Sequence, residues 1–222
     1  MNQKIKIIFS TLSIGLMVTL ACKNKDSGLS TNPVQQAAEL QNYGTGFELM
    51  TPQSIIYWMG SSPTGSHNGS LKFKESKFFI DQAGKLAGGV FNIDMNSLVD
   101  LDISDPEEKK DFEENLKGGN FFQVDSFPLA EFRIDSVRDS QDSLTNSLVY
   151  GELTIKSIAK PLQIKAHVNI AENTMLITVP EFVIDRTEWG INYNSKKIFS
   201  SLIDNLINDE IKINMKILAI RK

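Results

Sequence analysis

The strongest constraint on this chain is a two-residue alternation of apolar and polar side chains that recurs from Phe47 to the C-terminus. Because successive side chains of a β-strand point to opposite faces, each such run predicts a strand with one buried face and one solvated face. The runs are residues 71–73, 91–95, 132–134, 153–155, 162–170 and 211–217.

Turn-forming residues separate these runs at 81–84, 117–120, 138–147 and 171–174. Many one-faced strands joined by short turns predict an all-β fold, an antiparallel barrel or sandwich. One or two short helices interrupt it. Residues 106–117 follow Ser104-Asp105, a favourable N-cap, and residues 197–207 carry apolar side chains at helical spacing.

The N-terminus has the features of an export signal. Lys4 and Lys6 precede an apolar stretch at 7–20, which is shorter than a bilayer-spanning helix needs. The stretch ends in Leu20-Ala21-Cys22, which resembles the bacterial lipobox. We therefore expect a signal peptide at 1–21 and a lipidated Cys22 with a flexible linker at 22–46. The protein would be lipid-anchored in the cell envelope, at the outer membrane or in the periplasm. The alternative is an N-terminal anchor helix that happens to end in cysteine.

Composition argues against several functions. Removing residues 1–21, which carry two lysines and no acid, takes the formal net charge from −4 to −6, so nucleic acid is an unfavourable partner. Cys22 is the sole cysteine and there are two histidines, too few for most zinc sites, so no metal or cofactor is expected. No nucleophile elbow or phosphate loop occurs in the sequence, and we expect no enzymatic activity.

A series of short motifs, in order along the chain, resembles the YceI-like, polyisoprenoid-binding family. They are 58–60 (WMG), 65–69 (GSHNG), 88–97 (GGVFNIDMNS), 116–124 (LKGGNFFQV), 127–132 (FPLAEF), 151–156 (GELTIK), 160–161 (KP) and 184–190 (IDRTEWG). The resemblance covers residues 47–222. The chain departs from the family pattern at Asn115, where histidine is frequent, and at Ser157, where glycine is frequent.

The resemblance implies a lipocalin-like β-barrel over residues 47–222 that encloses an apolar tunnel for a long isoprenoid or other lipid. It leaves a homodimer possible. The residues that we expect on the apolar wall are Trp58, Phe73, Phe91, Phe121, Phe122, Phe132, Phe182 and Trp189. His67 and Arg186 are the candidates for contact with a polar head group.

Each of these assignments has an alternative. The aromatic side chains could equally fill a solid core, in which case the chain would be an envelope interaction module without a ligand. Arg186 could instead form a salt bridge that fixes the turn before Trp189, and His67 could form a hydrogen bond that fixes its own loop. His167 lies among the polar positions of its run, so we expect it to be exposed to solvent.

Overall fold

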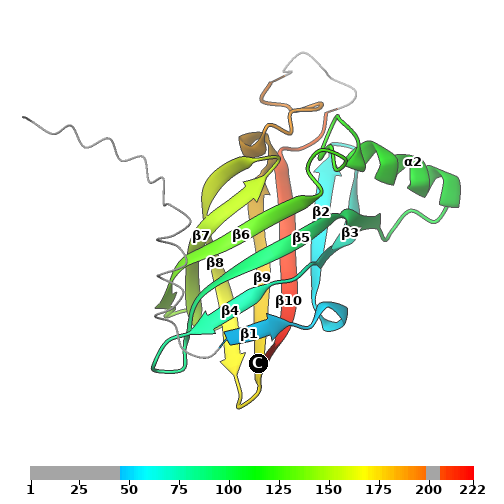
Figure 1. Ribbon diagram of the computed structural model, residues 1–222. Coiled ribbons are helices and arrows are strands. Elements are labelled where there is room, and N and C mark those ends of the chain that lie inside the picture. The colour runs from blue at the N-terminus through cyan, green and yellow to red at the C-terminus, as the bar shows by residue number, and fades with distance from the viewer. Residues whose placement is uncertain (1–45, 199–205) are drawn as a thin grey trace, which may run out of the picture.

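A computed structural model describes residues 46–198 and 206–222. Its strands form a closed antiparallel barrel of eight, in the order β5-β3-β2-β10-β9-β8-β7-β6, which the β5–β6 pairing closes. Figure 1 shows the barrel with helix α2 (Pro106–Lys117) beside one end of it. The barrel strands are β2 (Ile55–Ser62), β3 (Gly65–Phe73), β5 (Leu86–Asp100), β6 (Leu129–Asp139), β7 (Ser147–Ile155), β8 (Ile158–Ile170), β9 (Thr174–Asp185) and β10 (Glu210–Arg221).

Two short strands, β1 (Gly46–Leu49) and β4 (Lys77–Ile80), complete the wall at the other end of the barrel. The first half of β5 pairs with β4, and its second half pairs with β3. β10 divides in the same way between β2 and β1. The ring of hydrogen-bonded strands is therefore continuous along the whole barrel, and this protects the strand edges from pairing with other chains.

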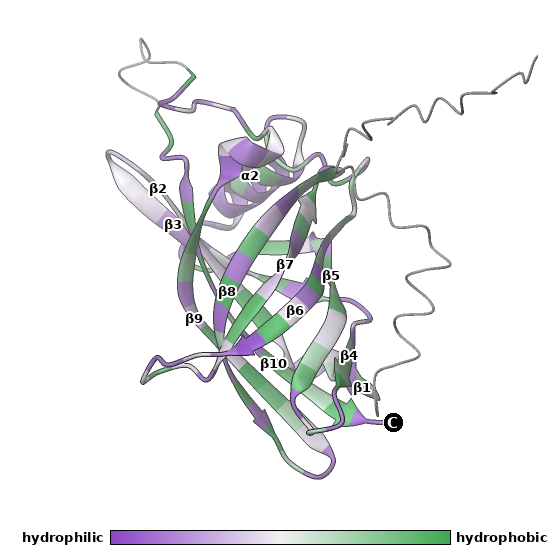
Figure 2. Cartoon of the chain, turned by 90° about the vertical axis from the view of Figure 1, so that its left-hand side faces the viewer, coloured by the Kyte–Doolittle hydropathy of each residue, from purple (hydrophilic) through white to green (hydrophobic). Residues whose placement is uncertain are grey.

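The alternation predicted from the sequence is confirmed. In β7 every second residue is buried, from Ser147 to Ile155. In β8, Ile164 and Ala166 are buried whereas Lys165 and His167 are exposed, as expected for His167. Figure 2 shows hydrophobic and hydrophilic positions alternating along the strands of the barrel.

Helix α2 (Pro106–Lys117) has the bounds that the sequence predicts. The Asp105 carboxylate accepts hydrogen bonds from the backbone N–H groups of Glu107 and Glu108, and Pro106 occupies the first turn, where its missing N–H costs nothing. Leu116 is buried and Phe112 packs against the core, so the helix covers one end of the barrel with its apolar face. We call this end the α2 end.

The helix expected over 197–207 falls mostly outside the described residues, although Lys197 and Ile198 lie in a turn. At the other described end of that range, Ile207 forms a single β-bridge with Ser195. Elsewhere in the described part of the chain, η1 (Thr51–Gln53) and η2 (Arg186–Trp189) are 3-10 helices. The expected signal peptide at 1–21, Cys22 and all but the last residue of the linker also lie outside the described residues. Among the residues described, no helix is both long enough and apolar enough to cross a bilayer.

The barrel end opposite α2 is packed solid. Phe47 of β1, Phe78 of β4, Met175 of β9 and Ile217 of β10 are all fully buried there. Phe47 and Phe78 face each other across the β1–β4 pair. Close packing of these side chains stabilises the strands and seals this end against solvent.

Candidate ligand-binding site

The barrel interior holds a cavity of about 230 Å³. Its lining comes from every barrel strand, and nearly all of it is apolar. The polar side chains of the lining belong to Ser61, Ser62, Ser66, His67 and Arg186, from the β2–β3 hairpin and η2. The sealing residues Phe47, Phe78, Met175 and Ile217 are absent from the lining, so the cavity extends from the α2 end toward a closed floor.

The structure places all eight predicted aromatic wall residues on this lining. They are Trp58, Phe73, Phe91, Phe121, Phe122, Phe132, Phe182 and Trp189. Three of the rings pack against one another in tilted arrangements, because the Phe91 centroid lies 6.1 Å from that of Phe73 and 5.9 Å from that of Phe132. Their contact with a ligand stays a prediction.

Two glycines make room for aromatic rings on the wall. Gly69 pairs with Trp58, and a Cβ on it would lie 2.3 Å from the indole ring and 2.0 Å from the carbonyl oxygen of Val99. A Cβ on Gly151 would lie 2.6 Å from the ring of Phe132. Both glycines therefore let a ring lie flat against a neighbouring strand. Gly69 and Gly151 belong to the motifs at 65–69 and 151–156, but the motifs alone do not indicate this role.

The Trp58 ring has a second property. Its indole nitrogen, Nε1, is buried and has no hydrogen-bond partner among the residues that the structure describes. Buried polar groups usually have such a partner, because losing it costs about 1–3 kcal/mol. The other tryptophan of the wall, Trp189, follows the rule and donates to the Leu153 carbonyl at 3.0 Å.

Aromatic side chains crowd the α2 end of the cavity. Phe121, immediately after α2, lies 5.4 Å from the Tyr193 ring, and the guanidinium of Arg186 lies 6.0 Å from the centre of the Phe121 ring. The Lys156 ammonium donates to the Phe121 carbonyl at 3.0 Å and ties this segment to the turn between β7 and β8. These contacts hold Phe121 at the end of the cavity.

Arg186 is buried, and its hydrogen bonds support the structural alternative for this residue. The guanidinium donates to the carbonyls of Ile191 at 2.7 Å, Ile207 at 3.1 Å and Asn208 at 3.2 Å, and to the Asp209 carboxylate at 3.3 Å. The four bonds engage most of the five N–H groups of a guanidinium. The ion-pair partner is Asp209, twenty-three residues away, which sequence reasoning missed.

Burial lowers the pKa of the Arg186 guanidinium, while the charges of Asp209 and Asp185 oppose that shift. An arginine keeps its proton even so, because the ordinary pKa of a guanidinium lies far above neutral pH. The Asp185 carboxylate caps η2 through Thr187 and pairs with Lys197. Arg186 thus carries a buried positive charge at the α2 end.

His67 lies in strand β3 and not in the loop that the sequence suggested, and its hydrogen bond reaches a different segment of the chain. Its Nδ1 lies 3.1 Å from Oδ2 of Asp102, in the loop after β5, and its ring packs on Phe112 of α2 at 4.6 Å. His67 and Phe112 also line the cavity. Contact of either His67 or Arg186 with a head group stays a prediction.

The two departures from the family pattern have local effects. Asn115 is exposed on α2 and accepts a hydrogen bond from Asn120, away from the cavity. Ser157 lies in the two-residue turn between β7 and β8 with a φ of 61°. This left-handed conformation favours glycine over serine.

These features define a lipocalin-like antiparallel barrel with an internal apolar cavity, sealed at one end and lined with polar groups near the other. The particular family follows from comparison with known proteins. The family model of the YceI-like domain matches residues 47–219, and the chain belongs to this family. A comparison with curated proteins finds no match.

Solved structures share the fold. BcnA of Burkholderia cenocepacia superposes with a TM-score of 0.61 at 20% identity, over 77% of this chain and 98% of that one. A polyisoprenoid-binding domain from Saccharophagus degradans, implicated in plant cell wall breakdown, superposes with a TM-score of 0.57 at 12% identity, over 81% of this chain and 100% of that one.

Proposed function

We propose that this protein binds a long apolar isoprenoid or other lipid in its barrel cavity and acts as a non-catalytic carrier or store, tethered to an envelope membrane through a lipidated Cys22. The observation that carries the proposal is the cavity of about 230 Å³, whose lining is almost entirely apolar. Membership of the YceI-like family and the shared fold with a polyisoprenoid-binding domain support it.

The energetics of the site favour a hydrocarbon chain. Burial of each CH₂ group is worth about 0.8 kcal/mol, so one five-carbon isoprene unit contributes about 4 kcal/mol. Part of that gain offsets the ordering of the chain on binding. A hydrocarbon needs no hydrogen bonds from the wall, and the aromatic group around Phe91 offers none.

An interaction module with a filled barrel would require a sizeable exposed apolar patch. Within the described residues, most of the exposed large hydrophobic side chains are spread over separate strands and loops, although Tyr57 and Met59 share the outer face of β2. Where two of them come near each other, Met59 of β2 and Val183 of β9, Lys212 of β10 pairs with both and lies between them. The outer face therefore gives this alternative less support than the cavity gives to lipid binding.

Blocking the cavity tests lipid binding. Ala130 of β6 and Ala166 of β8 are buried and line the cavity, so Ala130→Phe and Ala166→Phe each place a phenyl ring in it. Ala159 is exposed on the same strand as Ala166, so Ala159→Phe is the matched control. We expect either blocking variant to fold and to lose about tenfold or more of its affinity for geranylgeraniol, an isoprenoid alcohol. The control should bind like the wild type.

The natural ligand is read out in parallel by organic extraction and mass spectrometry of protein purified from bacterial membranes. An apolar compound present in the wild type and depleted in Ala166→Phe supports the proposal. A wild type without such a compound, or blocking variants that bind geranylgeraniol like the wild type, would refute it.

For the tether, Cys22→Ser should abolish palmitate labelling and release the protein from the membrane fraction. The homodimer stays a prediction.

A further inference from the structure

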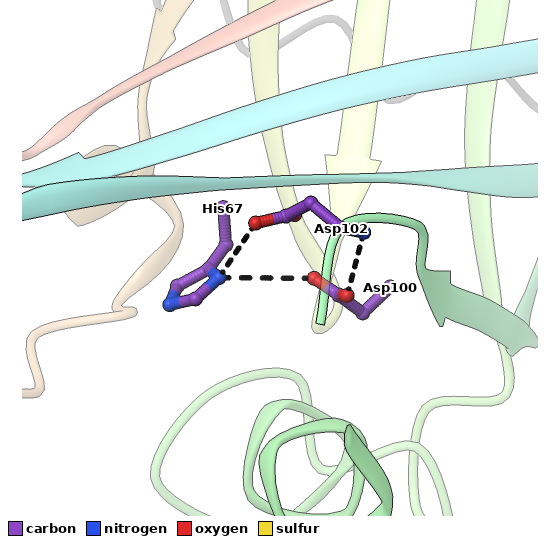
Figure 3. Close-up of side chains that lie close together, drawn as sticks. All are labelled: His67, Asp100 and Asp102. Carbon is purple, nitrogen blue, oxygen red and sulfur yellow. Dashed lines mark hydrogen bonds and ion pairs between the residues drawn. The ribbon is translucent and has the colours of Figure 1, made fainter. Parts of the chain in front are cut away.

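A cluster of three side chains lies at the α2 end, beside the cavity that one of them, His67, also lines. His67 comes from β3, Asp100 is the last residue of β5, and Asp102 follows it by two residues. One ligand atom from each lies within 4.8 Å of the others. Figure 3 shows the imidazole and the two carboxylates turned toward a common point.

Asp100 is the unusual member of this cluster because its side chain is fully buried. Its Oδ1 accepts hydrogen bonds from the backbone N–H groups of Asp102 at 2.9 Å and Ile103 at 2.7 Å. Its Oδ2 has no hydrogen-bond partner in the part of the chain that the structure describes. This oxygen is directed at Nδ1 of His67, 4.0 Å away. A buried carboxylate oxygen left without a partner is costly and indicates a missing cation or proton.

The charge around this oxygen is negative. Glu113 of α2 accepts a hydrogen bond from the Asp100 backbone N–H at 2.9 Å, and its pairing with Lys117 is loose, at 4.0 Å. Burial raises the pKa of Asp102, but hydrogen bonds from the Asn68 backbone N–H and from His67 outweigh this effect and hold that pKa below its usual range. With a neutral imidazole, three carboxylates and one lysine leave a local charge of −2.

From this geometry we propose that His67 Nδ1, Asp100 Oδ2 and Asp102 Oδ2 bind a divalent transition-metal ion such as Zn²⁺. One imidazole and two carboxylates form a suitable donor set, and three protein ligands leave a fourth position for water. The cation supplies the missing partner of Asp100.

The distances within the cluster are close to those of a zinc site, since all three ligand atoms lie within 4.8 Å of one another. Tetrahedral Zn²⁺ with bonds of about 2.1 Å holds its donor atoms about 3.4 Å apart. The His67 nitrogen lies 3.1 Å from Oδ2 of Asp102 and 4.0 Å from that of Asp100. The His67 side chain is 44% exposed and can rotate, whereas both carboxylates are held by backbone N–H groups. Asn68 donates to Oδ1 of Asp102 at 2.7 Å, and Asp102 and Ile103 donate to Oδ1 of Asp100, so each carboxylate keeps its Oδ2 for the ion.

The metal-free cluster has a different role for the same atoms. In it, Nδ1 of His67 lies within hydrogen-bond distance of the Asp102 carboxylate, whereas metal binding requires that nitrogen to present its lone pair to the cation. Binding of the ion at Nδ1 changes the surroundings of the ring, so the signals of the histidine ring report it.

The test is a Zn²⁺ titration of the full chain, freed of metal and lipid and carrying an affinity tag without histidine, followed by the NMR signals of the histidine rings. The chain has two histidines, so His167, exposed on β8, is an internal control. We expect the His67 signal to shift until one Zn²⁺ is bound per protein, while the His167 signal stays in place. In protein produced without lipidation, which leaves Cys22 as a free thiol, Cys22→Ser should behave like the wild type and so exclude binding by that thiol.

Asp100→Asn is the sharpest variant, because it can keep the Oδ1 acceptor and replaces only the oxygen without a partner. We expect it to fold and to lose about tenfold or more in Zn²⁺ affinity, with a smaller rise in Tm on adding the ion. His67→Gln should lose affinity likewise, and it stands in if Asp100→Asn fails to fold. His167→Gln should match the wild type.

Three results would overturn the metal site. The first is a His67 signal that does not move at about tenfold excess of Zn²⁺, and the second is an equal response of both histidines. The third is wild-type affinity in Asp100→Asn and His67→Gln. The inference stands apart from lipid binding, because Ala166→Phe should bind Zn²⁺ like the wild type whatever its effect on geranylgeraniol.

Discussion

Replacing Arg186 with methionine should destabilise the protein strongly, because the guanidinium is buried and holds two separated segments together. It bonds Ile191 at one side and the chain at 207–209 at the other. Methionine fills much of the same space but supplies no donor. The change leaves the Asp209 carboxylate, which is almost fully buried, without its cation.

Removing one partner of a buried ion pair costs about 3–5 kcal/mol. The three carbonyls that lose a charged donor add to that cost, but the terms overlap and do not sum. For a domain of this size, each kcal/mol lowers Tm by about 2–4 °C, so we expect a decrease of about 6–20 °C. Urea denaturation monitored by tryptophan fluorescence measures the same loss at constant temperature.

A matched control is Arg133→Met on β6. Arg133 pairs with Asp135 at 3.2 Å and Glu152 at 3.3 Å, but all three side chains are partly exposed. Ion pairs of this kind are worth about 0–1 kcal/mol, so this variant should stay close to the wild type. If Arg186→Met does not fold, Arg186→Lys serves in its place and should lose less, because an ammonium can still pair with Asp209 but cannot reach all four acceptors.

The double variant Arg186→Met/Asp209→Asn measures how strongly the two residues are coupled. It should be less destabilised than the sum of the single variants, because no unpaired charge remains. A loss below about 1 kcal/mol in Arg186→Met would refute the structural role argued for this residue. Such a result combined with weaker lipid binding would favour the head-group contact instead.

Two further predictions concern a turn and the response to acid. Ser157→Gly should stabilise the protein by about 0.5–1 kcal/mol, because glycine relieves the left-handed backbone at φ 61°; Ser157→Ala keeps a Cβ and should show no such gain in urea denaturation. The pKa of Asp185 lies below its usual 3.8, because the hydrogen bonds from Lys197 and Thr187 outweigh the effect of burial. The stability that the ionised Asp185 carboxylate contributes is therefore complete above pH ~5 and is lost as the pH falls through the lowered pKa. The difference in unfolding free energy between the wild type and Asp185→Asn should shrink with acidification. A difference that stays constant from pH ~6 to ~3 would contradict the assignment.

Much of the fold could be predicted because its signals are local. Alternation in a single run such as 162–170 determines which side chains face inward, whatever the strand pairs with. The bounds of α2 follow from Asp105 and Pro106, which satisfy or remove the free N–H groups of its first turn. The five predicted wall aromatics that lie on strands line the cavity for the same reason, since strand parity alone selects the inner face; they are Trp58, Phe73, Phe91, Phe132 and Phe182. Strand parity does not account for the other three, because Phe121 and Phe122 follow α2 and Trp189 ends η2.

The rest depends on pairing between residues far apart in the chain. Inward-facing phenylalanines are compatible with a filled or a hollow barrel, and only the strand arrangement decides that Phe78 seals one end while Phe132 lines a cavity. The partner of Arg186 is Asp209 and not its neighbours in sequence, because β9 and β10 pair there. Likewise, the β3–β5 register places Asp100 opposite Gly69 and so beside His67. Alternation and capping are properties of a few consecutive residues, whereas cavities and ion pairs are properties of the closed barrel.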